Sequence, residues 1–120
     1  MYAEHILDHY HNPRHHGTLT TPTVTADGHN TSCGDKLTVQ LRCDGDTIVE
    51  AAFDGDGCAI SQAAASILLE YIVGKDIATL KNLDASGMLE LLEMPLSPAR
   101  MKCGLLALET AQRAAADISA

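Results

Sequence analysis

The segment "KLTVQLRC", residues 36–43, constrains the fold most, because apolar and polar side chains alternate strictly along it. This period of two is typical of a β-strand with one buried face. A tight turn, "DGD", follows it, and the next segment, "TIVEAAF", has the composition of a return strand. The sequence therefore predicts a β-hairpin over residues 36–53, and a further strand near residues 23–26 would complete a small antiparallel sheet of about three strands.

The segment after the hairpin predicts a long helix. In "AISQAAASILLEYIVG", residues 59–74, the only consistent polar positions are Gln62, Ser66 and Glu70, which recur every four residues. A helix that is apolar nearly all round is largely buried, and here it would keep one narrow polar stripe. Gly74 suits the C-terminal cap of this helix.

Four shorter or later segments also read as helices. Residues 2–11 place Ile6, Leu7 and Tyr10 on one side, and "DIATLKNL" and "ASGMLELLE" predict two short helices. The last helix has Ser97 as its N-cap and Pro98 at its first position, and it runs to about residue 117. Its expected inner face consists of Met101, Leu105, Leu108 and Ala111.

The order of these segments predicts an α+β fold. A helix comes first, a small antiparallel sheet follows, and the C-terminal half is helical, so the helices are expected to pack on one face of the sheet. With 120 residues and no internal linker or repeat, the chain is expected to form one domain over residues 1–120.

The charge balance narrows the classes of partner. A net charge of −8 argues against binding to nucleic acid, which requires a basic surface. No apolar run is long enough to span a membrane, and the N-terminus has no signal-peptide pattern. The expected location is therefore the cytoplasm, where the four cysteines would be reduced thiols rather than two disulfides.

Three of the cysteines stand at the ends of predicted elements. Cys33 lies just before the hairpin, Cys58 just after it in "GDGCAIS", and Cys103 early in the last helix. A hairpin brings its two ends together, so Cys33 and Cys58 are expected to be neighbours, and a helix on the sheet could bring Cys103 to the same place. Cys43, by contrast, shares the inward face of the first hairpin strand and is expected to act as a small core residue.

The flanking residues suit metal or thiol chemistry. Gly34, Gly55 and Gly57 would let the backbone bend close to a bound atom. Helix N-termini favour the thiolate form of cysteine, and Arg100 and Lys102 add positive charge beside Cys103, which would make that thiol a better ligand and a better nucleophile.

Asp35 stands two residues after Cys33, so the pair could aim a thiolate and a carboxylate at one ion. Three thiolates and one carboxylate complete a tetrahedron that zinc accepts and iron tolerates. The alternatives are that isolated cysteines without C-x-x-C carry no metal, that Asp35 is a turn residue, and that Arg100 and Lys102 form a solvated helix face.

The histidines give weaker signals. His5 and His9 have the i, i+4 spacing of a metal pair, but "HILDH" lacks the glutamate of a metalloprotease, and three more histidines close by favour a His-rich surface segment. His29 is a further ligand candidate because it stands near Cys33 in a stretch expected to be flexible.

Taken together, these motifs resemble a known family over nearly the whole chain. They are "NPRHHG" after the first helix, "CGDKLTVQL", "FDGDGCAISQAAASILLE", "VGK" and a cysteine opening the final helix. The chain is similar to the IscU/SufU family, which includes the N-terminal domain of NifU. The resemblance implies iron–sulfur cluster assembly with sulfur delivered by a cysteine desulfurase, and passage of the cluster to downstream acceptor proteins.

The same resemblance implies a site of three cysteines and one aspartate that holds zinc, iron or a transient [2Fe–2S] cluster. By motif position these residues are Cys33, Asp35, Cys58 and Cys103.

The sequence mixes the patterns of two branches of this family. IscU-type members carry a histidine before the third cysteine and the chaperone-recognition stretch "LPPVK", whereas this chain has Lys102 and "MPLSPARMK", so chaperone docking is not expected. The stretches "PARMKC" and "GDGCAIS" are SufU-like, but the usual SufU insertion is missing between Gly74 and Pro95.

Three functions follow as alternatives. The leading one is a cluster-assembly scaffold that accepts sulfur, with Cys103 taking the persulfide and Asp35 serving as the exchangeable ligand. The second is a zinc-dependent sulfurtransferase, in which zinc yields one thiolate for attack. The third is a structural zinc module without chemistry.

Overall fold

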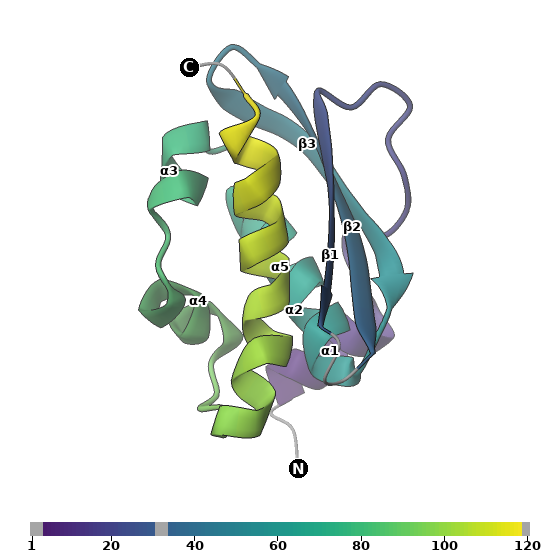
Figure 1. The fold of residues 1–120 in the computed structure, drawn as a ribbon, viewed down its shortest axis with the longest axis vertical. Helices are drawn as coiled ribbons and strands as arrows, with labels where there is room; N and C mark the ends of the chain where they lie inside the picture. The colour runs from purple at the N-terminus through teal and green to yellow at the C-terminus, as the bar shows by residue number, and fades with distance from the viewer. Residues whose placement is uncertain (1–3, 31–33, 119–120) are drawn as a thin grey trace.

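An antiparallel sheet of three strands, in the order β1-β2-β3, forms one layer of the molecule, and helices form the other (Figure 1). The computed structural model describes residues 4–30 and 34–118. Its elements are α1 (Glu4–His11), β1 (Val24–Asn30), β2 (Asp35–Asp44), β3 (Thr47–Asp56), α2 (Ala59–Ile72), α3 (Ile77–Asn82), α4 (Ala85–Leu92) and α5 (Pro98–Ala116). The predicted α+β class and the hairpin are confirmed.

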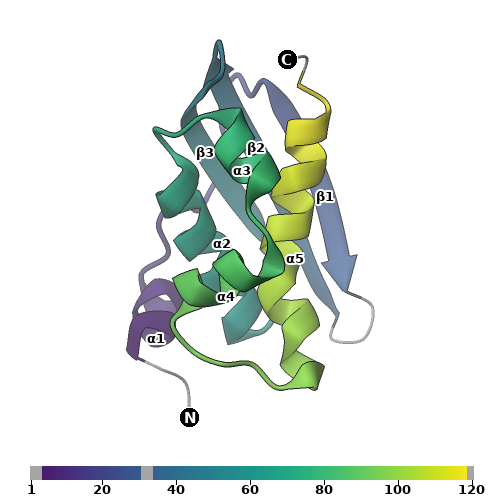
Figure 2. The same cartoon turned by 90° about the vertical axis from the view of Figure 1, so that its left-hand side faces the viewer.

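The core lies between the sheet and helices α2 and α5, which cover the same face (Figure 2). Leu37, Val39 and Leu41 of β2 point into it, as their alternation predicts. The closest approach is between β1 and α5, where a Cβ atom at Gly28 would stand 2.0 Å from Thr110 Oγ1. A glycine is therefore required for α5 to lie against the edge strand.

Strand β1 is longer than the predicted segment 23–26. It runs to Asn30 because residues 27–30 pair with residues 35–38 of β2. Asp, Gly and Asn are poor strand formers, so pairing with β2 rather than local preference makes this half of the strand. His29 consequently lies in a strand, not in a flexible stretch.

Two predicted inner faces are partly wrong. In α1 the buried residues are Ile6 and His9, whereas Tyr10 is 41% exposed. In α5, Met101 and Leu105 are only half-buried. The buried face of α5 is wider because the sheet, α2, α3 and α4 all contact this helix; it comprises Cys103, Gly104, Leu106, Ala107, Leu108, Thr110, Ala111, Ala114 and Ala115.

Cys43 is half-buried rather than fully inside. The pairing of β2 with β3 shifts between Arg42 and Cys43, and such an irregularity ends the strict alternation of faces. The residue still packs against the core, and burial raises the pKa of its thiol. Both observations fit its predicted role as a small apolar side chain.

The polar stripe of α2 is the place where α1 attaches. Ser66 Oγ lies 2.7 Å from His9 Nδ1 and accepts a hydrogen bond of 2.8 Å from the backbone N–H of Arg14. Arg14 also pairs with Asp8 at 2.8 Å. His9 is therefore a buried structural residue and not part of a surface segment. The helix ends as predicted, with Gly74 at φ +91° just beyond it.

We predict that His9 makes stability depend on pH. Burial, followed by the nearby Arg14 and His5 charges, lowers the pKa of His9 below 6.5, although Glu70 and Asp8 act in the opposite direction. The unfolded chain then binds this proton more tightly than the folded protein does. The buried, neutral His9 therefore contributes its full share of the unfolding free energy above about pH 6.5, and this share is lost as the pH falls through the lowered pKa of the folded state.

Urea denaturation between pH 7 and pH 5 measures this effect. Replacing His9 with glutamine should flatten the decline in unfolding free energy, and replacing the exposed His11 with glutamine should not. An equal pH slope in wild type and the His9→Gln variant would contradict the assignment.

Candidate metal centre

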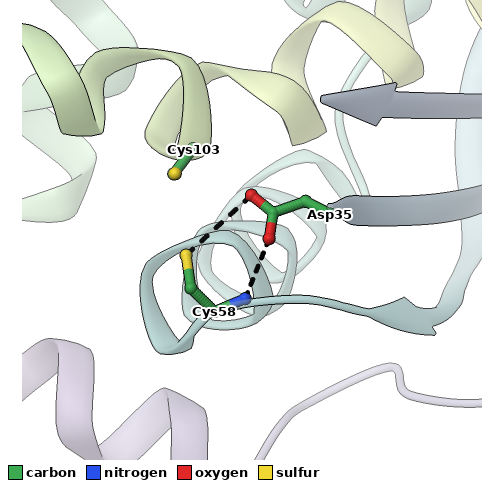
Figure 3. Close-up of side chains that lie close together, drawn as sticks. All are labelled: Asp35, Cys58 and Cys103. Atoms are coloured by element: carbon green, nitrogen blue, oxygen red, sulfur yellow. Dashed lines mark hydrogen bonds between the residues drawn. The ribbon is translucent and has the colours of Figure 1, made fainter. Parts of the chain in front are cut away.

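Three segments that are distant in sequence bring ligand-type side chains together at one end of the core (Figure 3). Asp35 begins β2, Cys58 is the N-cap of α2, and Cys103 lies in α5. One ligand atom from each of the three residues lies within 4.8 Å of the other two. In the described part of the chain this is the only such group of three or more histidine, cysteine or acidic residues.

Asp35 orients Cys58 directly. The Asp35 carboxylate is completely buried, and its Oδ1 accepts a 2.9 Å hydrogen bond from the backbone N–H of Cys58. Its Oδ2 lies 3.9 Å from the Cys58 sulfur. The Cys58 side chain makes no capping bond to its own helix, so its sulfur is left for other chemistry. The carboxylate therefore fixes the backbone while it faces the thiol.

The glycines beside Cys58 make this approach possible. A Cβ atom at Gly57 would stand 2.7 Å from Asp35 Oδ1 and 2.4 Å from Ser61 Oγ. Gly55 has φ +146°, and a Cβ there would meet the Lys36 carbonyl oxygen at 2.0 Å. Both contacts are shorter than side chains tolerate, so the loop needs glycine at the two positions for packing against β2.

Ser61 is a further participant that the sequence interpretation missed. Its side chain is buried, and its hydroxyl donates a 3.1 Å hydrogen bond to the carbonyl oxygen of Cys58. The residue thus fixes the peptide that follows the Cys58 thiol. A serine in the first turn of a helix is a common feature, and only the neighbouring fold makes it part of this site.

Cys103 is more enclosed than a cysteine at a helix start was expected to be. It is the sixth residue of α5, in the second turn, and it is completely buried. Arg100 and Lys102 are both exposed. Cys33 lies outside the described residues.

The donor set fits a tetrahedral ion. With zinc–sulfur bonds of about 2.3 Å, two sulfur ligands stand about 3.8 Å apart. Donor atoms within 4.8 Å need only small side-chain movements to reach this spacing. Two thiols and a buried carboxylate suit zinc or iron better than magnesium or calcium, which prefer oxygen ligands.

A model of the NifU-like N-terminal domain family matches residues 1–120. Among curated proteins, the zinc-dependent sulfurtransferase SufU of Bacillus subtilis is 35% identical, with 97% of this chain and 90% of the relative aligned. The iron–sulfur cluster assembly scaffold protein IscU of Thermotoga maritima is 34% identical over 99% of this chain and 95% of the relative.

The alignment with SufU spans 133 positions, more than the length of this chain, so that relative has residues without a counterpart here.

The fold has solved counterparts. A crystal structure from Fervidobacterium islandicum, described as a candidate scaffold protein for the SUF system, superposes with a TM-score of 0.79. It is 32% identical and covers 95% of this chain and 96% of its own. Within the described residues, no helix combines the length and apolar character needed to cross a membrane.

We predict that Gly57→Ala damages the site before it damages the fold. The added methyl group would push Asp35 away from the Cys58 N–H, so zinc affinity, measured by competition with a chromophoric chelator, should fall about 10–100-fold. The double variant Gly57→Ala/Ser61→Ala removes the contact with Ser61 but keeps the one with Asp35, and it should remain impaired. Full recovery in the double variant would show that the Asp35 contact is unimportant.

Proposed function

The chain belongs to the NifU-like N-terminal domain family, and we propose that it is an iron–sulfur cluster assembly scaffold that accepts sulfur from a cysteine desulfurase. In this proposal zinc, iron or a nascent [2Fe–2S] cluster is bound by three thiolates and one carboxylate. The proposed ligands are Cys33, Asp35, Cys58 and Cys103.

The observation that carries the proposal is the convergence of Asp35, Cys58 and Cys103 from three separate elements. A buried carboxylate is costly unless it is neutralised or hydrogen-bonded, and a cation shared with two thiolates would neutralise it. Cys33 enters the proposal from the sequence alone, since it stands two residues before Asp35. A bound ion would supply the positive charge that keeps the thiols in their thiolate form.

Sulfur transfer would proceed as a thiol exchange at Cys103. The Cys103 thiolate attacks the outer sulfur of the donor's persulfide, the donor's sulfur–sulfur bond breaks, and the donor leaves as a thiolate while the new persulfide remains on Cys103. No external oxidant is required. Because Cys103 is completely buried, the first turns of α5 must move before a donor can reach it.

The partners in this proposal are a cysteine desulfurase and downstream acceptor proteins. The composition of the site favours a reducing compartment such as the cytoplasm, where free thiols persist. Among the described residues, Cys43 and Cys58 form no disulfide. The stretch "MPLSPARMK" gives no reason to add a chaperone that reads "LPPVK".

A zinc-dependent sulfurtransferase is the second candidate, and the similarity to a protein of that name in Bacillus subtilis favours it. In this case Asp35, Cys58 and Cys103, together with Cys33, would hold zinc, which would keep their thiols as thiolates, and Cys103 would be the thiolate that attacks the persulfide. Zinc removal should then block transfer to Cys103. A pure scaffold should instead accumulate visible cluster absorption when it is reconstituted anaerobically with iron and a desulfurase.

We predict that Cys103→Ser abolishes sulfur acceptance, because serine is a far weaker nucleophile than a thiolate. The protein is incubated anaerobically with a desulfurase and ³⁵S-cysteine, and bound label is counted after separation on a non-reducing gel. The variant Cys43→Ser removes a thiol away from the site and should retain full labelling. Equal labelling of wild type and the Cys103→Ser variant would refute the role of Cys103.

We predict that Asp35→Ala slows release of the bound group. Replacing the exchangeable carboxylate leaves only thiolate ligands, so a reconstituted cluster should pass to an acceptor apoferredoxin about tenfold more slowly, a change of 1.4 kcal/mol in the barrier. Transfer is followed by the visible absorption of the acceptor.

A structural zinc module gives a different result for the same variant. Asp35→Ala would then lose metal and thermal stability together. Because Asp35 also accepts the Cys58 N–H, Asp35→Asn, which keeps an oxygen acceptor for this bond, is the matched control: loss of metal and stability in this variant as well would favour the third alternative over a scaffold.

A further inference from the structure

A groove lined by residues of α1, α2 and the α4 region lies on the helical side of the molecule. Figure 2 shows these three helices near one another. The groove has a volume of about 400 Å³ and an apolar and polar lining. The lining residues are His5, His9, Ile67, Glu70, Tyr71, Glu90, Leu91 and Glu93. The volume suits one or two side chains of a bound segment rather than a folded domain.

The groove is separate from the metal centre. Glu70 and Tyr71 lie near the C-terminal end of α2, whereas Cys58 precedes the start of the same helix. Glu70 stands twelve positions after Cys58 in the sequence, which corresponds to about 18 Å along a helix axis. Asp35, Cys58 and Cys103 do not line the groove, so an occupant here would leave the metal centre open.

The groove carries negative charge that the protein neutralises only in part. Glu90 has no ion pair with any described residue. Glu93 Oε2 stands 3.4 Å from His5 Nε2, which pairs with it only when the imidazole is protonated. Glu70 is 3.6 Å from Arg14 Nε, but Arg14 makes its shorter contact with Asp8 at 2.8 Å.

The other groups at the groove add one positive charge at its margin, that of Lys75. No lysine or arginine lines it. Burial lowers the pKa of His9, so this imidazole is neutral at neutral pH. Lys75 lies next to the groove, where its Nζ sits 4.3 Å from the centre of the Tyr71 ring and donates to the Tyr71 carbonyl oxygen.

We propose that this groove docks a basic segment of a partner protein. An apolar side chain of the segment packs between Tyr71 and Leu91, and flanking arginine or lysine side chains pair with Glu90 and Glu93. The apolar surface of Tyr71 and Leu91 and the carboxylates of Glu90 and Glu93 together favour such a segment. An acidic segment would be repelled by the carboxylates, and a purely polar segment would leave the apolar surface exposed to water. The proposal does not depend on the assembly function and would stand without it.

Binding of short synthetic peptides to the full-length protein tests this proposal. The probe carries arginines on both sides of one leucine; a second peptide replaces the leucine with serine, and a third replaces the arginines with glutamates. We expect the arginine–leucine peptide to bind most tightly by fluorescence anisotropy, and its amide chemical-shift changes to centre on His5, Tyr71 and Leu91.

A charge-matched pair of variants separates docking from general attraction to an acidic protein. Glu90→Gln/Glu93→Gln should weaken the arginine–leucine peptide about tenfold, which corresponds to 1.4 kcal/mol. Glu109→Gln/Asp117→Asn makes the same change in net charge at an exposed position of α5 and at its exposed C-cap, and should leave the affinity within about twofold.

Three outcomes would overturn the proposal. Equal weakening by both variants would mean non-specific attraction. Equal affinity for the serine and leucine peptides would mean that the groove recognises only the positive charges and not the apolar side chain. Amide chemical-shift changes centred outside the groove would mean that the peptide binds to another surface.

Discussion

The hydrogen bond from the Cys58 backbone to the buried Asp35 carboxylate is the contact on which the site depends. It joins the start of β2 to the start of α2, and so it ties the sheet to the most buried helix. One carboxylate oxygen is satisfied by this N–H, and the other faces the Cys58 thiol at 3.9 Å. A charge in such a position is unfavourable without a counter-ion, so the fold holds a group that a metal ion would stabilise.

The same arrangement explains how one site could hold an ion and still exchange it. Cys103 lies in the second turn of a long helix, whereas Cys58 stands between a glycine loop and a helix. A carboxylate is a harder and weaker ligand for zinc or iron than a thiolate, and Asp35 retains its backbone partner when it releases an ion. The loss of one ligand would therefore leave the loop in place.

The sequence predicted most of the fold because its local signals agree with the tertiary structure. The alternation in residues 36–43 and the apolar run after Cys58 both reflect burial, and they predicted β2 and α2. Local sequence signals failed where contacts with other elements determine the structure. Residues 27–30 form a strand only through pairing with β2, and His9 is buried only because Ser66 receives it.

The sequence anticipated that Asp35, Cys58 and Cys103 lie close together, but not their geometry, and the fourth predicted member, Cys33, lies outside the described residues. Element ends and family motifs pointed to Asp35, Cys58 and Cys103, yet no pattern indicated that Cys103 is completely enclosed or that Ser61 fixes the Cys58 peptide. Gly57 was expected to admit a bound atom, and its close neighbour is Asp35. Such contacts depend on how the elements pack, which local sequence does not encode.

Titration of the metal-free protein with Co²⁺ tests most directly whether these residues form one metal centre. The account predicts one equivalent of tightly bound cobalt, with intense visible bands of tetrahedral coordination and a near-ultraviolet thiolate-to-cobalt band that weakens in Cys58→Ser and Cys103→Ser. A weak octahedral spectrum without the thiolate band, or a spectrum unchanged by both substitutions, would contradict it.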